Sequence, residues 1–288
     1  MLVTTQDVRV VWLGDPAANE VGLVGAKAAN LSRLANSYRV PAGFCLTAAS
    51  LAADEHTDLS PNLRRDVAQA YAALAERCGE ASPPVAVRSS AIDEDGATAS
   101  FAGQHETYLN VRGADAVAQS IARCWQSLHA PRALEYRRQR GIAPSSTGLA
   151  VLVQQLVQAD ASAVVFSANP VTGMRDQVVL TSTWGLGESL VGGTVSPDSY
   201  LVRKSDLAME LRHIATKRRM TVLVDGGTAE VDVAAGLQQQ PAVGDSQVLD
   251  AVRLALELER TFGWPVDVEC AWERTTLYLL QCRPITTL

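Results

Sequence analysis

The sequence predicts an α+β protein with two lobes, a helix-bearing lobe over residues 1–145 and a β-rich lobe over residues 146–288. The chain has 288 residues and is 47% hydrophobic and 19% charged, which is enough apolar material for one large or two smaller domains. Apolar residues recur at helical spacing in the first half, whereas short β-type runs fill the second half. The composition changes near Ser145 and Ser146, where we place the boundary.

Composition and charge argue against several classes of protein. The net charge of −6 disfavours a nucleic-acid surface, and the basic runs at 137–138 and 217–219 are short enough to be solvated faces. The five cysteines are odd in number and include no CxxC pair, which argues against zinc and indicates reduced, mostly buried thiols in a cytoplasmic protein. We find no signal peptide and no apolar run of about 20 residues, so we expect no membrane segment.

The first lobe is expected to begin with a strand at 8–13, a turn at 15–20 and a helix at about 27–35. A longer helix starts at Ser60 and Pro61, because serine is a favoured N-cap and proline suits the first helical position. Strands are expected at 85–87 and 107–111. An amphipathic helix should cover 114–128, and a short basic helix should cover 131–140.

The second lobe is expected to open with apolar strands at 149–157 and 161–167, joined as a hairpin by the turn residues 158–160. A strand at 177–182, a glycine-rich stretch at 184–200 and a helix at 245–261 follow. The chain closes on two alternating strands with a turn at 273–274. Alternation places Asp267 and Glu269 on one face of the first strand, and Leu279, Gln281 and Arg283 on one face of the second.

Residues 85–111 carry the first chemical signal. A β-type run delivers Arg88, and an acidic, glycine-containing loop follows at 93–103. An arginine beside small residues suits a polyphosphate, because the guanidinium supplies a fixed charge and the small residues let backbone N–H groups approach phosphate oxygens. The alternative is a surface hairpin with a salt-bridged arginine.

Lys27 is the second candidate. It follows the glycines Gly22 and Gly25 at the start of a predicted helix, where N–H groups and a lysine charge favour a phosphate. The spacing does not fit a Walker P-loop. An exposed lysine is the alternative.

The terminal strands carry the third signal. A carboxylate at Glu269, an amide at Gln281 and the Arg283 guanidinium on one antiparallel pair are able to hold a magnesium–phosphate assembly, because Mg²⁺ prefers oxygen ligands and retains substrate phosphates in its shell. The alternative is the polar outer face of an edge hairpin.

These segments together resemble a known family. They include GAKAANL at 25–31, VPAGF at 40–44, RSSA at 88–91, ASFAGQ at 99–104, WGLGE at 184–188 and LLQCRP at 279–284. The order and content resemble the N-terminal ATP-binding domain of the phosphoenolpyruvate synthase, pyruvate phosphate dikinase and rifampin phosphotransferase family. The resemblance implies an ATP-grasp fold in which two lobes enclose a nucleotide cleft.

The resemblance also implies residue roles, with Mg²⁺ and ATP as ligands. Lys27, Arg88 and Arg283 match the cations that neutralise the triphosphate, and they are the candidate catalytic residues. Glu269 and Gln281 match the metal-ligand positions.

Three further residues are expected near the nucleotide. Gln154 is the candidate adenine neighbour, with a sheet-exposed glutamine as the alternative. Ser100 and Gly103 belong to the loop 93–103. It carries three acidic residues and few large apolar groups, so we expect it to be mobile without nucleotide and ordered by ATP through backbone contacts.

The phosphoryl acceptor is open at this stage. Family enzymes pass a phosphoryl group to a histidine on a mobile domain, but no TSHxA-type motif is present, and we expect His105 to be non-catalytic. The first hypothesis is an ATP-dependent phosphotransferase domain or subunit that works with a histidine domain elsewhere. The second is a self-contained kinase or ligase that acts on a small molecule, and the third is a nucleotide-binding regulatory module without turnover.

Overall fold

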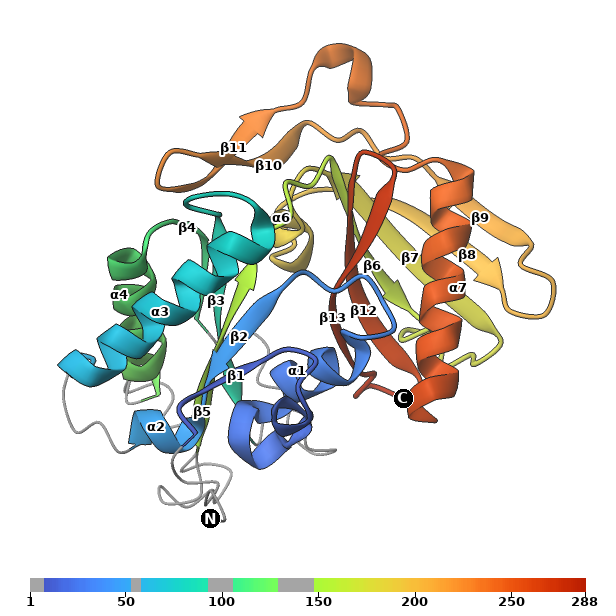
Figure 1. The fold of residues 1–288 in the computed structure, drawn as a ribbon. Helices are drawn as coiled ribbons and strands as arrows, with labels where there is room; N and C mark the ends of the chain where they lie inside the picture. The colour runs from blue at the N-terminus through green and yellow to red at the C-terminus, as the bar shows by residue number, and fades with distance from the viewer. Residues whose placement is uncertain (1–7, 53–57, 93–105, 129–147) are drawn as a thin grey trace. The chain divides into compact units, whose positions relative to one another are not determined.

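The computed structural model describes residues 8–52, 58–92, 106–128 and 148–288 (Figure 1). The chain divides into two compact units. Unit 1 contains Met1–Ser37 and Pro41–Leu156, and unit 2 contains Tyr38–Val40 and Val157–Leu288. The expected lobe boundary at 145–146 and the expected basic helix at 131–140 lie outside the described residues.

Unit 1 is built on a five-stranded sheet. Its strands, in spatial order, are β1 (Val10–Trp12), β2 (Gly43–Leu46), β5 (Leu149–Gln155), β3 (Val85–Ala91) and β4 (Thr107–Val111). All four neighbouring pairs are antiparallel. Every residue of β5 except the last is buried, and its first five residues, 149–153, form a continuous apolar run.

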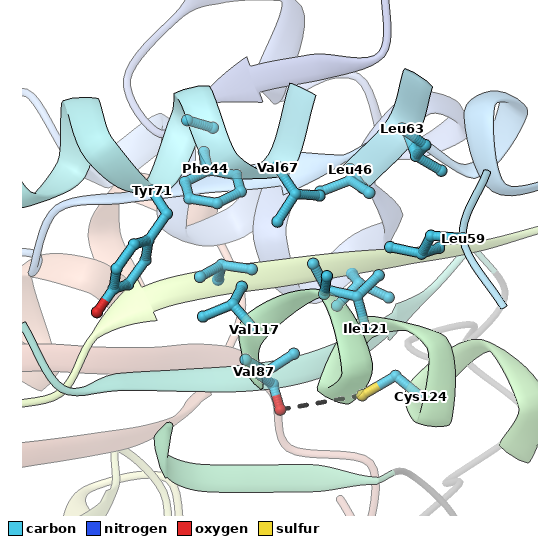
Figure 2. Packing of buried hydrophobic residues seen from close by; sticks show 14 of the residues in the cluster. Phe44, Leu46, Leu59, Leu63, Val67, Tyr71, Val87, Val117, Ile121 and Cys124 are labelled. Atoms are coloured by element: carbon cyan, nitrogen blue, oxygen red, sulfur yellow. Dashed lines mark hydrogen bonds between the residues drawn. The ribbon is translucent and has the colours of Figure 1, made fainter. Parts of the chain in front are cut away.

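One face of this sheet is covered by α3 (Pro61–Cys78) and α4 (Ala114–Ser127). The Oγ of Ser60 accepts a hydrogen bond from the Leu63 N–H, which confirms the predicted N-cap. Figure 2 shows the core that results, with helix residues packed on strand residues; it contains Phe44, Leu46, Val67, Tyr71, Val87, Val117 and Ile121.

The opposite face carries α1 (Val21–Leu34), which follows the 3-10 turn Pro16–Asn19; the short α2 (Ala48–Ala52) follows β2. Gly25 interrupts α1, because its φ of 76° and ψ of 164° are not helical. The regular helix therefore runs from residue 26 onward, close to the predicted start at 27. Since Arg88 and Gln154 alternate with Val87 and Val153, which face α3 and α4, both lie on the α1 face.

Unit 2 is built on a six-stranded antiparallel sheet. Its strands, in spatial order, are β13 (Thr276–Pro284), β12 (Val266–Glu273), β6 (Ala161–Phe166), β7 (Gln177–Trp184), β8 (Asp198–Arg203) and β9 (Met209–His213). Helix α7 (Asp245–Phe262) packs on one face of this sheet with its buried side chains, Val248, Ala251, Val252, Ala255 and Leu258 (Figure 1).

A second hairpin, β10 (Arg219–Val224) and β11 (Gly227–Asp232), belongs to the same unit. The remaining short elements are α6 (Glu188–Val191) and the 3-10 turn Ala235–Leu237. The segment before β10 is anchored by a fully buried ion pair, in which Lys217 donates to Oδ1 of Asp198 and to the Ala215 carbonyl. Oδ2 of Asp198 accepts from the Ala242 N–H at 2.8 Å, so one carboxylate joins three segments.

The structure confirms the mixed helix-and-sheet class and corrects one strand pairing. The expected hairpin of 149–157 with 161–167 is wrong, because β5 pairs with β2 and β3 in unit 1, whereas β6 pairs with β12 and β7 in unit 2. Residues 158–160 therefore form a crossover between two sheets. Turn-type residues between apolar runs fit either arrangement, and only the distant partner strands select between them.

The cysteines agree with the prediction of reduced thiols. None of the five forms a disulfide, and only Cys78 is not buried. Burial raises the pKa of Cys124 to about 12, so this thiol stays protonated at neutral pH. Among the described helices, none is both long and apolar enough to cross a membrane.

Candidate functional site

The first group of predicted site residues lies where α1 meets β3. The Nζ of Lys27 donates a hydrogen bond to the Ser89 carbonyl at 3.1 Å. Arg88, the preceding residue on β3, pairs with Leu152 of β5 and Thr107 of β4. The backbone therefore brings the two predicted phosphate-binding cations of unit 1 to adjacent positions, although they are 61 residues apart in the sequence.

Gln154 lies on the same sheet face, one strand away. It is only 2% exposed, and its Nε2 donates to the Pro41 carbonyl at 3.2 Å. Its strand neighbours are Gly43 of β2 and Ala86 of β3. The alternative of a sheet-exposed glutamine is therefore wrong, and the adenine role stays a prediction.

The second group lies on β12 and β13 in unit 2. Glu269 pairs directly with Gln281, and Asp267 pairs directly with Arg283, two residues along each strand. The four side chains therefore share one face of the strand pair. The opposite face carries the buried Val268 and Cys270.

One expected member does not belong to this face. A β-bulge shifts the register between Glu269 and Cys270, so Leu279 pairs with Cys270. The prediction that Leu279 shares the face of Gln281 and Arg283 is therefore wrong. An extra residue, here Leu280, reverses the alternation of everything before it, and it leaves no mark in the sequence pattern. Leu279 joins the core and is 2% exposed.

Asp267 is the site residue that sequence reasoning missed. Its Oδ2 accepts a hydrogen bond from Nε of Arg283 at 2.8 Å, and its side chain is only 7% exposed. Its buried Oδ1 has no hydrogen-bond partner among the described residues. The signal was the Asp-x-Glu alternation, which placed Asp267 on the same face as Glu269.

Burial raises the pKa of the Asp267 carboxyl above its usual range, the Glu269 carboxylate raises it further, and Arg283 opposes both. Because Asp267 and Gln281 are both buried, the alternative of a solvated outer hairpin face does not describe this group. An unpartnered buried carboxylate oxygen beside a second carboxylate is the kind of site that attracts a cation or a proton.

The donor chemistry of this face fits Mg²⁺. It offers carboxylate oxygens from Asp267 and Glu269 and an amide oxygen from Gln281, and Mg²⁺ is usually bound by one or two carboxylates with substrate phosphates completing the shell. The part of the chain that the structure describes contains no group of three or more His, Cys, Asp or Glu side chains placed to hold a metal alone.

Several predicted residues cannot be placed. Ser100, Gly103 and His105, together with the loop 93–103 and its expected ordering by ATP, lie outside the described residues. His213 is described and is exposed on β9.

Comparison with known proteins decides the family. Residues 51–288 match the model of the family described as "Pyruvate phosphate dikinase, AMP/ATP-binding domain". The chain belongs to this family. Arg88, Gln154 and the whole β12–β13 face lie inside the matched range, whereas Lys27 precedes it.

Individual proteins also match the chain, over 81% to 97% of its length. The chain is 42% identical over 235 residues to a probable phosphoenolpyruvate synthase of Methanocaldococcus jannaschii, which covers 81% of this chain and 20% of the relative. It is 33% identical to the phosphoenolpyruvate synthase of Pyrococcus furiosus, covering 97% of this chain and 44% of the relative. It is 40% identical to the rifampicin phosphotransferase of Streptomyces sviceus, covering 94% of this chain and 35% of the relative. The chain thus spans less than half the length of each of these relatives.

Proposed function

We propose that this chain is the Mg²⁺- and ATP-binding part of a phosphotransferase of the phosphoenolpyruvate synthase type, with an ATP-grasp fold. In this proposal it cleaves ATP and passes a phosphoryl group to a histidine on a separate domain. The family match and the names of the relatives support the nucleotide and the reaction class. The chain spans less than half the length of these relatives, which supports a phosphoryl acceptor outside the matched region.

The observation that carries the proposal is the register of β12 and β13. It places the predicted metal ligands Glu269 and Gln281 directly opposite each other and puts Arg283 on the same face. Phosphoryl transfer needs positioning and charge neutralisation more than covalent help from the protein. This face offers Glu269 and Gln281 to position a metal ion and Arg283 to neutralise phosphate charge.

Each residue has a distinct proposed task. Glu269 and Gln281 would hold Mg²⁺, which would neutralise part of the phosphate charge. Arg283 would bind a phosphate, and its contact with Asp267 restricts the orientation of the guanidinium. Lys27 and Arg88 would bind phosphate oxygens, and Gln154 would lie beside the adenine.

Calorimetry with Mg-ATP tests the binding proposal. We expect saturable binding to the wild-type chain and loss of most of it in Glu269→Ala. Glu210→Ala is the matched control, because Glu210 lies on β9 of the same sheet and bonds Arg203 and Gln177. The proposal is wrong if Glu269→Ala binds Mg-ATP as tightly as Glu210→Ala does.

Phosphorus NMR of ATP tests the acceptor. With Mg²⁺ and ATP alone, we expect little net turnover. Addition of the remaining portion of the Pyrococcus furiosus relative should support ATP cleavage and a phosphohistidine signal. Rapid turnover with a small-molecule acceptor alone would instead indicate a self-contained kinase or ligase, and tight binding without turnover under any condition would indicate a regulatory module.

A further inference from the structure

Ser90 is a buried serine that joins β3 to the start of α1. It is 0% exposed, and its Oγ accepts a hydrogen bond from the Ala28 N–H at 3.2 Å. Ala28 follows Lys27 directly, within the first turn of regular helix after Gly25. Backbone N–H groups in a first helical turn have no partner within the helix. Ser90 therefore satisfies one of these donors from an element 62 residues away in the sequence.

Gly25 makes this contact sterically feasible. A Cβ added to Gly25 would lie 2.2 Å from the Ser90 carbonyl oxygen and 2.5 Å from its Oγ. Gly25 also has a φ of 76°, a conformation that disfavours residues with a side chain. Both polar oxygens of Ser90 are therefore seated against the backbone that precedes Lys27.

Consecutive residues of α1 bond to consecutive residues of β3. Lys27 donates from its side chain to the Ser89 carbonyl, and Ala28 donates from its backbone to Ser90. Arg88 and Ser90 share a face of β3, because side chains alternate along a strand. The hydrogen bond to Ser90 thus fixes the position of α1 along β3, and with it the position of Lys27 relative to Arg88. The hydrogen bond from the long Lys27 side chain would not fix this position by itself.

We propose that Ser90 is a positioning residue for polyphosphate binding, which sets α1 against β3 so that Lys27 and Arg88 engage the same phosphate group or adjacent ones. Ser90 acts through Lys27 and need not touch the nucleotide. This inference rests on the proposed function, since it assigns the geometry of two of the phosphate-binding residues.

Ser90→Ala tests the inference against the matched control Tyr71→Phe. The Tyr71 hydroxyl accepts from the Gly113 N–H at 2.9 Å and donates to the Pro83 carbonyl at 2.8 Å, on the α3 and α4 side of the sheet. Each variant removes one hydroxyl and leaves one backbone N–H without its partner. Both should lower the free energy of unfolding. Only Ser90→Ala should weaken Mg-ATP binding, by about threefold to tenfold, and unchanged affinity in Ser90→Ala would overturn the inference.

A double-mutant cycle tests the route of action. If Ser90 acts through Lys27, Ser90→Ala should cause little further loss of Mg-ATP affinity in a Lys27→Ala background. An undiminished loss in that background would show that Ser90 acts in another way, and the inference would be wrong.

Amide exchange separates this inference from the proposed function, because it needs no nucleotide. Ser90→Ala should speed exchange at Ala28 and leave Gly113 unchanged, and Tyr71→Phe should do the reverse. Absence of Mg-ATP binding in the wild-type chain would refute the proposed function. Unchanged Ala28 exchange in Ser90→Ala would refute the positioning role separately.

Discussion

Arg283 donates through Nε to Oδ2 of Asp267 at 2.8 Å, although Asp267 is buried and Arg283 is partly exposed. The arginine predicted to bind phosphate is thereby held by a carboxylate whose other oxygen has no partner among the described residues. Arg283 and the Glu269–Gln281 pair lie on the same face of the strand pair. The Asp267–Arg283 ion pair therefore affects both the stability of the strand ends and the proposed phosphate binding. It motivates the first two predictions.

Arg283→Ala should lose most of the Mg-ATP affinity. Each hydrogen bond to a charged group contributes roughly 1.5–3 kcal/mol, so loss of one or two such bonds predicts at least a tenfold change. Arg203→Ala is the matched control, because Arg203 on β8 donates through Nε to Glu210 at the same 2.8 Å. Calorimetry of both variants checks the prediction, and equal affinities would refute the assignment of Arg283.

Asp267→Asn should change how stability depends on pH. Burial raises the pKa of Asp267 in the folded protein above the ordinary value of 3.8, so the native state keeps this proton to higher pH than the unfolded chain does. The associated stabilisation is therefore complete below the unfolded pKa and is lost as the pH rises through the folded pKa.

The free energy of unfolding of the wild type, relative to Asp267→Asn, should thus fall as the pH rises from the ordinary carboxyl range and then level off. Urea unfolding across the acid-to-neutral range measures this difference. Asp250→Asn serves as the control, because Asp250 is exposed and pairs with Arg253 along its own helix. Parallel pH curves for the wild type and Asp267→Asn would contradict the predicted direction.

Lys217→Met should destabilise unit 2 severely. Removal of one partner from a fully buried ion pair typically costs about 3–5 kcal/mol, since it leaves Asp198 buried and uncompensated. Lys204→Met is the matched control, because Lys204 pairs with Glu259 at a partly exposed position, where such pairs contribute about 1 kcal/mol or less. Thermal and urea unfolding of the two variants compare these costs, and equal destabilisation would show that burial does not set the effect.

Gly25→Ala should cost more stability than Gly79→Ala. Gly79, with φ 66° and ψ 23°, lies in the left-handed helical region, where a side chain carries a backbone strain of about 1–2 kcal/mol. Gly25, with φ 76° and ψ 164°, lies in a region that essentially only glycine adopts, so its substitution carries a strain of about 1–3 kcal/mol. A Cβ at Gly79 would meet nothing within 4 Å, whereas a Cβ at Gly25 would lie 2.2 Å from the Ser90 carbonyl oxygen. The steric contact and the less tolerant backbone conformation of Gly25 both contribute to the difference in the free energy of unfolding. Similar values for the two variants would mean that α1 shifts away from β3 at little cost.

Much of the local structure was predictable because it depends on local rules. The N-cap at Ser60, the amphipathic faces of α3, α4 and α7, and the alternation along β12 follow from spacing and side-chain chemistry within a few residues. The kinds of side chain in the candidate site were also predictable, since each motif contains its own charged or amide residue.

The tertiary structure decided which distant segments meet. Pairing of β5 with β2 and β3 placed Gln154 in a buried position, and the bulge at Leu280 moved Leu279 off the face of Gln281. Long-range pairing depends on the fit of whole sheets, which no short sequence window contains.

The sequence by itself thus determined the longer helices among the described residues, most of the strands, the family resemblance and the identity of the candidate ligands. Only the tertiary structure placed Ser90 against Gly25 and Ala28, and Asp267 against Arg283. The physical reason is that burial and hydrogen bonding between residues far apart in the chain are properties of packed elements. A serine in a strand and an aspartate two residues from a glutamate have no distinguishing mark until their partners are brought to them.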